Sequence, residues 1–200
     1  MTDSAPSIEA VLRDRVAAAH DRRTAELRTQ VEAAERRLAE RLAVTVTFRL
    51  VLEGPGGGAW HLVLRDGAMH VERATDATPL ITVFQNVDGW ERLLAAGGHL
   101  FTAAGGPEFS PGRVARLEAI AGALEFRLLE VDAGDPVSVI VQLGGGRERL
   151  DATTTITLRA ADAQRLRSGD LTPPQAMMQG LVQIGGDASL AIQVGIALFM

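Results

Sequence analysis

The stretch 168-SGDLTPPQAMMQGLVQIGGDASLAIQV-194 carries the clearest pattern in the chain. It reads as the end of one helix, a turn, a second helix, a short strand, another turn and a final apolar helix. Pro173 and Pro174 fit the first turn of the second helix, where a missing backbone N–H breaks no hydrogen bond. Gly180 ends that helix, and 185–187 (Gly-Gly-Asp) turns the chain into the final helix.

This stretch resembles the C-terminal signature of the sterol carrier protein 2 (SCP2-like) family, G-k-l-x-P-x-x-A-f-m-x-G-k-l-x-i-x-G-d. The lysines of the signature are absent, because Gln179, Val182 and Gln183 occupy that region. The resemblance implies an antiparallel sheet covered by helices, and carriage of a sterol, fatty acid or acyl-CoA in an apolar tunnel. The matching residues are Gly169, Leu171, Pro173, Ala176, Met177, Met178, Gly180, Leu181, Ile184, Gly186 and Asp187.

Composition narrows the class of protein. Of the 200 residues, 46% are hydrophobic, which is enough for a core, and the net charge is −5. An acidic chain without a basic face argues against a nucleic-acid partner. All basic residues are arginine, which we interpret as the usage of a GC-rich bacterial genome. Since the chain shows neither a signal-peptide pattern nor an apolar run of about 18 residues, it predicts a cytoplasmic protein without a transmembrane segment.

Residues 1–43 form a predicted N-terminal helical segment, with the helix itself over 7–43. Its apolar residues recur every three or four positions, and Glu9 and Arg13 are spaced for an ion pair on one helix face. One long helix and two shorter ones both fit the pattern. The helix either packs on the following domain or forms a homodimer, although about two clean heptads are fewer than a sustained coiled coil needs.

Residues 44–200 read as one α+β domain. Alternating segments at 44–52, 59–65, 68–73 and 80–84 predict a meander and a fourth strand, followed by a helix at 87–96. A second set of strands is predicted at 124–131, 137–143 and 153–158, with helices before and after it. The fold class we expect is therefore an SCP2-like antiparallel β-sheet covered by helices, with a long N-terminal helix.

The two sets of elements resemble each other, which predicts an internal repeat of 44–98 and 124–199. Phe48 matches Phe126 in similar strands, and Ile81 matches Ile156 in the strands that precede the two helices. Internal duplication is the preferred interpretation. The alternative is a single SCP2-like domain with an insertion in the middle of the chain.

The sequence contains no recognisable catalytic cluster, metal site or cofactor motif. His61 and His70 lie on neighbouring strands, but two histidines without an adjacent carboxylate make a poor metal site. The serines lie in no nucleophile-elbow motif, and the chain has no cysteine. The expected function is accordingly binding rather than reaction.

We therefore expect a hydrophobic ligand (a lipid, fatty acyl group, sterol or terpenoid-like molecule) held without catalysis in an apolar tunnel. One alternative is a pocket enzyme or biosynthetic accessory, with Gln175, Gln179 or His99 aimed at a hydrophobic intermediate. Another is a structural dimerisation or scaffold protein with a filled cavity. The candidate ligand-binding residues are Phe84, Trp90, Leu94, Leu166, Met177, Met178, Leu181, Ile184, Leu190 and Val194.

Overall fold

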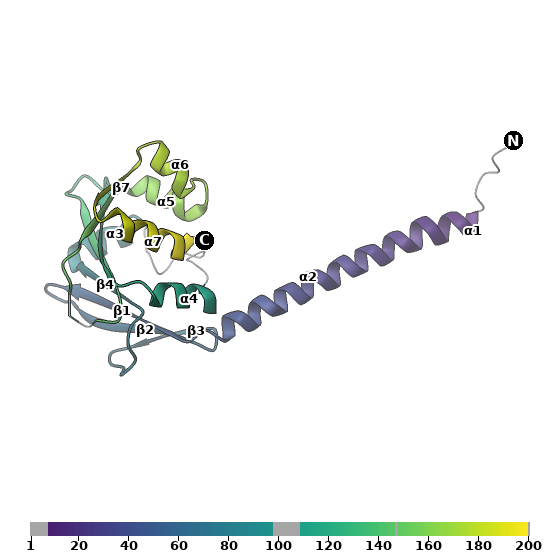
Figure 1. Ribbon diagram of the computed structural model, residues 1–200, viewed down its shortest axis with the longest axis horizontal. Helices are drawn as coiled ribbons and strands as arrows, with labels where there is room; N and C mark the ends of the chain where they lie inside the picture. The colour runs from purple at the N-terminus through teal and green to yellow at the C-terminus, as the bar shows by residue number, and fades with distance from the viewer. Residues whose placement is uncertain (1–7, 98–108, 147, 200) are drawn as a thin grey trace. The chain divides into compact units, whose positions relative to one another are not determined.

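The computed structural model describes residues 8–97, 109–146 and 148–199. The chain divides into two compact units, Met1–Glu40 and Arg41–Met200. The first unit is helical, and the second combines a sheet with helices (Figure 1). Among the described residues, no helix has the length and apolar character needed to cross a membrane.

One helical run, 8–42, confirms the predicted long N-terminal helix. It consists of α1 (Ile8–Val11), a π-helical segment η1 (Leu12–Ala17) and α2 (Ala18–Leu42). Its Ala, Glu, Arg and Leu residues have the highest helix propensities. The predicted pair is present, with Arg13 Nη2 2.7 Å from Glu9 Oε1. None of the side chains of α2 is buried within the first unit, so packing inside this unit does not explain its apolar residues.

The first half of the second unit is a meander followed by a strand and a helix. Its elements are β1 (Val46–Glu53), β2 (Gly58–Arg65), β3 (Ala68–Glu72), β4 (Ile81–Asn86) and α3 (Val87–Ala95). Asp66 and Gly67 form the tight turn between β2 and β3, both at positive φ. Asn86 caps α3 by accepting a hydrogen bond from the Gly89 N–H at 2.7 Å.

The second half has a similar series of elements, without a counterpart of β3, and continues into the C-terminal stretch. It contains α4 (Pro111–Glu118), β5 (Gly122–Leu129), β6 (Val137–Leu143), β7 (Thr154–Arg159) and α5 (Ala160–Ser168). α6 (Pro173–Met178), β8 (Val182–Gly186) and α7 (Ala188–Phe199) follow. The predicted succession of helix, strand and helix in 168–194 is thus confirmed.

The strands of the described residues join one eight-stranded sheet in the order β3-β2-β1-β4-β6-β5-β7-β8. The fold class is confirmed, but the sheet is mixed, not purely antiparallel as expected. The β1–β4 and β5–β7 pairs are parallel and the other pairs antiparallel. In each parallel pair the later strand lies on the free side of the earlier one: β4 pairs with β1 on the side away from β2, and β7 pairs with β5 on the side away from β6.

The two halves share one connectivity. β1 lies between β2 and β4, as β5 lies between β6 and β7, and a helix follows the last strand in each. Phe48 pairs with Ile81 in the first half, and Phe126 pairs with Ile156 in the second. These are the residues that the internal similarity of the sequence matches to each other.

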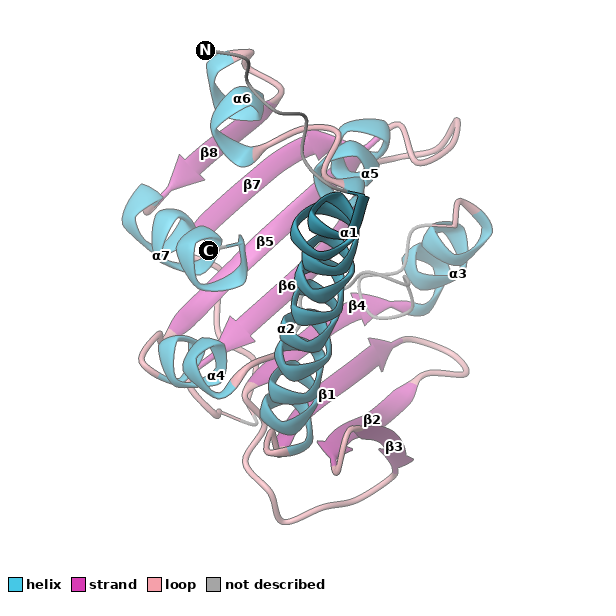
Figure 2. Cartoon of the chain, turned by 90° about the vertical axis from the view of Figure 1, so that its right-hand side faces the viewer, coloured by secondary structure: helices cyan, strands magenta, loops and turns pink. Residues whose placement is uncertain are grey.

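The helices of the second unit cover one face of the sheet, as Figure 2 shows for α3, α4, α5 and α7. Leu93 of α3, Leu117 of α4 and Leu190 of α7 are buried there against alternate residues of the central strands. Phe48, Leu124 and Val139 are the strand residues at the centre of this core, each at most 1% exposed.

On the opposite face, Gln142 holds the loop between β6 and β7. Gln142 follows Val141 and precedes Leu143 in β6, and both neighbours point into the core under the helices. Because side chains alternate along a strand, the Gln142 side chain points to the opposite face. Gln142 Nε2 donates to the carbonyls of Gly146 (3.2 Å) and Glu148 (2.9 Å), and its Oε1 accepts from the N–H of Leu150 (2.9 Å). Gln142 is 1% exposed, so these hydrogen bonds join a buried side chain of the sheet to the loop.

Candidate apolar binding site

The candidate site is a row of apolar side chains on the helix-covered face. Val139 of β6 pairs with Phe126 of β5, which pairs with Ile156 of β7, which pairs with Ile184 of β8. Residues paired in adjacent strands point to the same face of a sheet. We call these four side chains the apolar row; it crosses three strand spacings, or about 14 Å.

The apolar row is only partly covered. Val139 is fully buried, whereas Phe126, Ile156 and Ile184 are half-buried although they pack against the core. Leu128, two residues after Phe126 on the same face, is half-buried as well. Large apolar residues on a covered sheet face are normally removed from water, so this partial exposure marks where a hydrophobic molecule would gain most from binding.

A hydrogen-bonded corner positions α7 beside the row. The Asp187 N–H donates to the Thr153 carbonyl at 3.0 Å, and Thr154 Oγ1 donates to the Asp187 carbonyl at 2.8 Å. The Asp187 carboxylate accepts from the N–H groups of Ser189 (2.9 Å) and Leu190 (3.4 Å) in the first turn of α7. These bonds anchor α7 so that Leu190 and Val194 are buried against the sheet.

A capping box fixes the start of α6. Thr172 Oγ1 accepts from the Gln175 N–H, and Gln175 Oε1 accepts from the Thr172 N–H at 3.0 Å. Ala176 is fully buried, whereas Met177 and Met178 are 51% and 81% exposed. The exposed end of α6 therefore presents two flexible apolar side chains to solvent.

One polar side chain lies in line with the apolar row. Gln85 follows Phe84, which pairs with Ile140, and so stands at the level of Val139 on the next strand. It pairs with Leu52 on its other side. Gln85 is 4% exposed, and its Nε2 has no hydrogen-bond partner among the described residues. A buried amide of this kind costs about 1–3 kcal/mol when unsatisfied, so it marks a place for an acceptor.

The structure places the predicted site residues in three environments. Leu190 and Val194 are buried in the core, and Trp90, Leu166, Leu181 and Ile184 are half-buried. Leu94, Met177 and Met178 are exposed. Phe84 is buried on the other face, where the Arg149 guanidinium lies 5.9 Å from its ring centre. Phe84 is thus separated from the rest of the set by the thickness of the sheet.

Sequence reasoning missed Gln85, Phe126, Leu128 and Ile156. The three apolar residues alternate with polar neighbours in the strands 124–131 and 153–158, and this alternation was the available signal. Gln85 carries no such signal, because β4 is buried on both faces and its sequence does not alternate.

The polar groups of the other face form ion pairs. Burial raises the pKa of Glu125, but hydrogen bonds from Ser138 and Arg127 outweigh this and hold the pKa of the carboxyl below its ordinary value.

His61 and His70 lie on the same face of adjacent strands, two positions apart in register. Within the described residues, no group of three or more His, Cys, Asp or Glu side chains could hold a metal ion.

Comparisons with known proteins agree with the resemblance of the C-terminal stretch. Residues 108–198 match the model of the SCP-2 sterol transfer family. The matched residues include strands β5 to β8, which carry the apolar row, and the helices between these strands. A search of curated protein sequences found no significant match.

Solved structures of sterol carrier proteins are similar to parts of the chain. The apo form of Sterol Carrier Protein 2 from Yarrowia lipolytica is 22% identical over 38% of this chain and 66% of its own, with a TM-score of 0.31. The sterol carrier protein domain 2 of Helicoverpa armigera is 27% identical over 40% of this chain and 67% of its own, with a TM-score of 0.31. Sterol Carrier Protein 2 Like 2 from Aedes aegypti is 16% identical over 85% and 97%, with a TM-score of 0.22. The chain thus spans about two thirds of the length of the first two.

Proposed function

We infer, from the match of residues 108–198 to the SCP-2 sterol transfer family, that this protein binds and carries a hydrophobic molecule without transforming it. The observation that carries the proposal is the partly exposed apolar row on the helix-covered face. A lipid, fatty acyl chain, sterol or terpenoid-like molecule would lie along this row, between the strands and the helices α6 and α7. The ligand would complete the hydrophobic layer that the helices leave open.

The energetics of such a complex are favourable. Each methylene group buried contributes roughly 0.8 kcal/mol before the cost of association is subtracted. An acyl chain of the ligand that lies across β5, β7 and β8 would contact Phe126, Ile156 and Ile184 in turn. Few polar contacts are needed, because transfer of apolar surface out of water supplies most of the affinity.

Met177 and Met178 would act as an adaptable edge of the site. Methionine side chains adjust to irregular apolar shapes and are common at binding surfaces that accept several ligands. Both are exposed at the end of a short helix whose first turn is fixed by the capping box. This edge would close over a bound molecule without any change in the sheet.

Gln85 gives the site a polar end. Its unpartnered Nε2 would donate a hydrogen bond to a carboxylate or hydroxyl oxygen of the ligand. Gln85 lies one strand beyond Val139, so the distance from Gln85 to Ile184 is four strand spacings, or about 19 Å. A long acyl chain with an oxygen head group fits this arrangement of one polar and many apolar contacts.

Native mass spectrometry of the full chain purified from cells, followed by titration with a fluorescent fatty acid, tests the proposal. Co-purified lipid or saturable uptake is expected, and Ile184→Gln should weaken uptake at least tenfold because it places an amide in the row. Val71→Gln is the matched control, since Val71 is 67% exposed on β3 at the far edge of the sheet. A protein that is purified without lipid and takes up no fluorescent fatty acid would contradict the proposal.

The role of Gln85 at the polar end of the site is tested separately, by comparing two ligands that differ in their head group. Gln85→Leu is expected to weaken binding of palmitate more than binding of hexadecane, because only palmitate has an oxygen for the Gln85 amide. Equal effects on both ligands would remove Gln85 from the site while leaving carriage itself intact.

Carriage is favoured over the pocket enzyme by the placement of polar groups. The Gln175 side chain is engaged by Thr172, and Gln179 is exposed at the end of α6. His99 lies outside the described residues. We propose the cytoplasm as the site of action, consistent with an acidic chain that has no cysteine to form a disulfide.

We propose also that residues 44–98 and 124–199 arose by internal duplication. The shared connectivity and the equivalent Phe48–Ile81 and Phe126–Ile156 pairs support this. In a crystal structure, β1, β2, β4 and α3 should superpose on β5, β6, β7 and α5. If these elements did not superpose in chain order, an insertion into a single domain would be the better account.

A further inference from the structure

The helix α2 carries an apolar seam that the first unit does not bury by itself. Thr24, Leu27, Val31, Ala34 and Leu38 follow one another at intervals of three and four residues, the spacing of coiled-coil core positions. Leu27, Val31 and Leu38 are 55%, 56% and 57% exposed. Thr24, Leu27 and Val31 line a shallow hollow on the helix surface. A helix side chain can fill such a hollow.

The seam is confined to the second part of the helical run. The π-helical segment Leu12–Ala17 has a wider turn than an α-helix and shifts the phase of the side chains before it. Ile8 and Val16 are exposed but do not continue the seam in register. A short seam of this kind predicts reversible association.

Charges beside the seam disfavour a parallel pair of identical helices. With Leu27 and Ala34 at the d positions, Arg28 and Glu35 occupy e positions, and Arg23, Gln30 and Arg37 occupy g positions. In a parallel dimer each g residue faces the e residue five positions later in the other helix. Arg23 would then face Arg28 twice, and no opposite charges would meet.

One antiparallel register brings opposite charges together. When Leu27 packs against Leu38 of the second copy, Val31 packs against Ala34, and Arg28 faces Glu35. By symmetry, each of these contacts occurs twice. Shifting the register by one heptad places Arg28 against Arg28 in one direction, or Glu35 against Glu35 in the other. Only the register centred between Glu32 and Ala33 avoids like charges.

We propose that two copies of this protein associate through α2 as an antiparallel two-stranded coiled coil in this register. Leu27 and Leu38 form its outer layers, and Val31 and Ala34 its inner ones. The small Ala34 side chains let the helices approach closely, and the Arg28–Glu35 pairs fix direction and register. The dimer would thus carry two copies of the sheet domain, one continuing from each end of the coiled coil.

Sedimentation equilibrium of the full chain over a range of concentrations tests the proposal. The wild-type protein is expected to show a monomer–dimer equilibrium, and Leu27→Asn should abolish the dimer while circular dichroism keeps the sheet signal. Arg28→Glu and Glu35→Arg should each weaken dimerisation by about tenfold, since two attractive pairs become repulsive. The double variant, which swaps the charges, should restore wild-type affinity.

The same variants distinguish the orientations. In a parallel dimer Arg28→Glu would replace the Arg23–Arg28 repulsion by attraction, so stronger dimerisation would overturn the proposal. Arg36→Glu is the control, because Arg36 lies on the outer face of α2, away from the seam. A wild-type protein that stays monomeric at every concentration would overturn it too. Lipid uptake is measured separately, so failure of either proposal leaves the other standing.

Discussion

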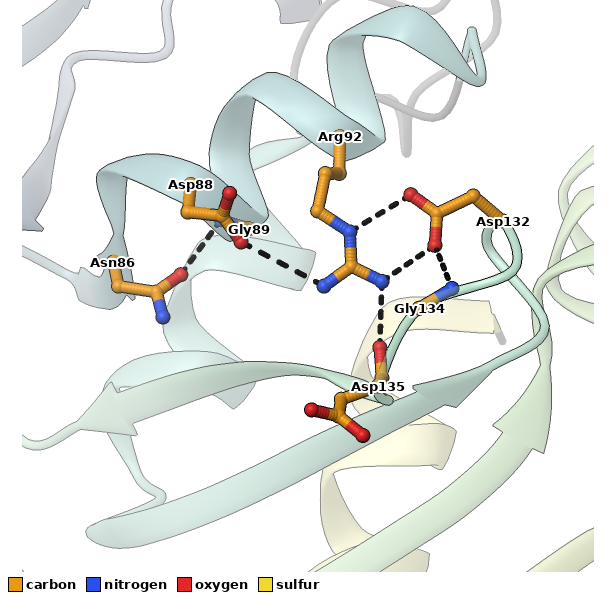
Figure 3. A network of polar contacts seen from close by, with 7 residues as sticks. All are labelled: Asn86, Asp88, Gly89, Arg92, Asp132, Gly134 and Asp135. Carbon is orange, nitrogen blue, oxygen red and sulfur yellow. Dashed lines mark hydrogen bonds and ion pairs between the residues drawn. The ribbon is translucent and has the colours of Figure 1, made fainter.

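Arg92 of α3 and Asp132, forty residues later in the loop between β5 and β6, form a two-pronged ion pair. Arg92 Nε donates to Oδ2 at 2.8 Å, and Nη2 donates to Oδ1 at 2.6 Å. Nη2 also donates to the Asp135 carbonyl at 2.6 Å, and Asp132 accepts from the Gly134 N–H at 2.7 Å (Figure 3). This network joins α3 to the loop between β5 and β6.

Replacing Asp132 should make stability depend on pH in a defined way. The hydrogen bond from Arg92, aided by the Gly134 N–H, lowers the pKa of Asp132 to about 2. A carboxyl whose pKa is lower in the folded state contributes stability above its ordinary pKa, and loses it as pH falls through the folded value. Asp132→Asn should therefore reduce the melting temperature at neutral pH, with the difference from wild type shrinking between about pH 4 and pH 2.

Thermal unfolding of both proteins across that range checks the prediction. Asp76→Asn, at an exposed position in the β3–β4 loop, serves as the control. A difference between wild type and Asp132→Asn that stayed constant down to pH 2 would show that the ion pair is not its origin.

Replacement by alanine should strongly destabilise the protein at Gly186 and have little effect at the neighbouring Gly185. Gly186 has φ of +77°, and a Cβ there would lie 2.1 Å from the Thr153 carbonyl oxygen, whereas a Cβ at Gly185 would meet nothing within 4 Å. Gly186→Ala should lower the free energy of unfolding by more than about 2 kcal/mol, since it strains the corner before α7. Gly185→Ala should change it by less than about 0.5 kcal/mol. Urea denaturation compares the two, and equal effects would contradict the close approach at Gly186.

Gln142→Leu should release the loop between β6 and β7. The side chain is 1% exposed and makes three hydrogen bonds to the backbone of that loop. Its loss removes all three of these hydrogen bonds, which tie the loop to β6, at a cost of about 2–3 kcal/mol. Limited proteolysis should show faster cleavage within 144–153 than in wild type. Gln183→Leu, at an exposed position on β8, is the control, and unchanged cleavage in Gln142→Leu would argue against this anchoring role.

Thr172→Ala should loosen α6 without unfolding the domain. It removes the capping box and is expected to lower the free energy of unfolding by about 1 kcal/mol. Hydrogen exchange should quicken at the N–H groups of α6 while β7 stays protected. Thr157→Ala, on β7 and at no helix cap, should leave exchange in α6 unchanged.

The local structure of this protein follows from the sequence by itself. The helix over 8–42, the tight turn at Asp66 and Gly67, and the α4 start capped by Ser110 at Pro111 depend on residues close in the chain. The resemblance of 168–194 to the sterol carrier family was also readable, because ordered prolines and glycines mark its turns. These features rest on local propensity and backbone sterics, which a single sequence expresses directly.

Only the tertiary structure decided which strands are neighbours and which faces meet. The parallel pairing of β5 with β7 aligns Phe126 with Ile156, and so creates the apolar row. Phe84 was predicted to bind the ligand, but it faces away from the helices and Gln85 faces toward them. The sequence did not indicate this, because β4 is central and buried on both faces. Long-range pairing sets the face of every residue in such a strand, since a shift of one position turns each side chain to the other side.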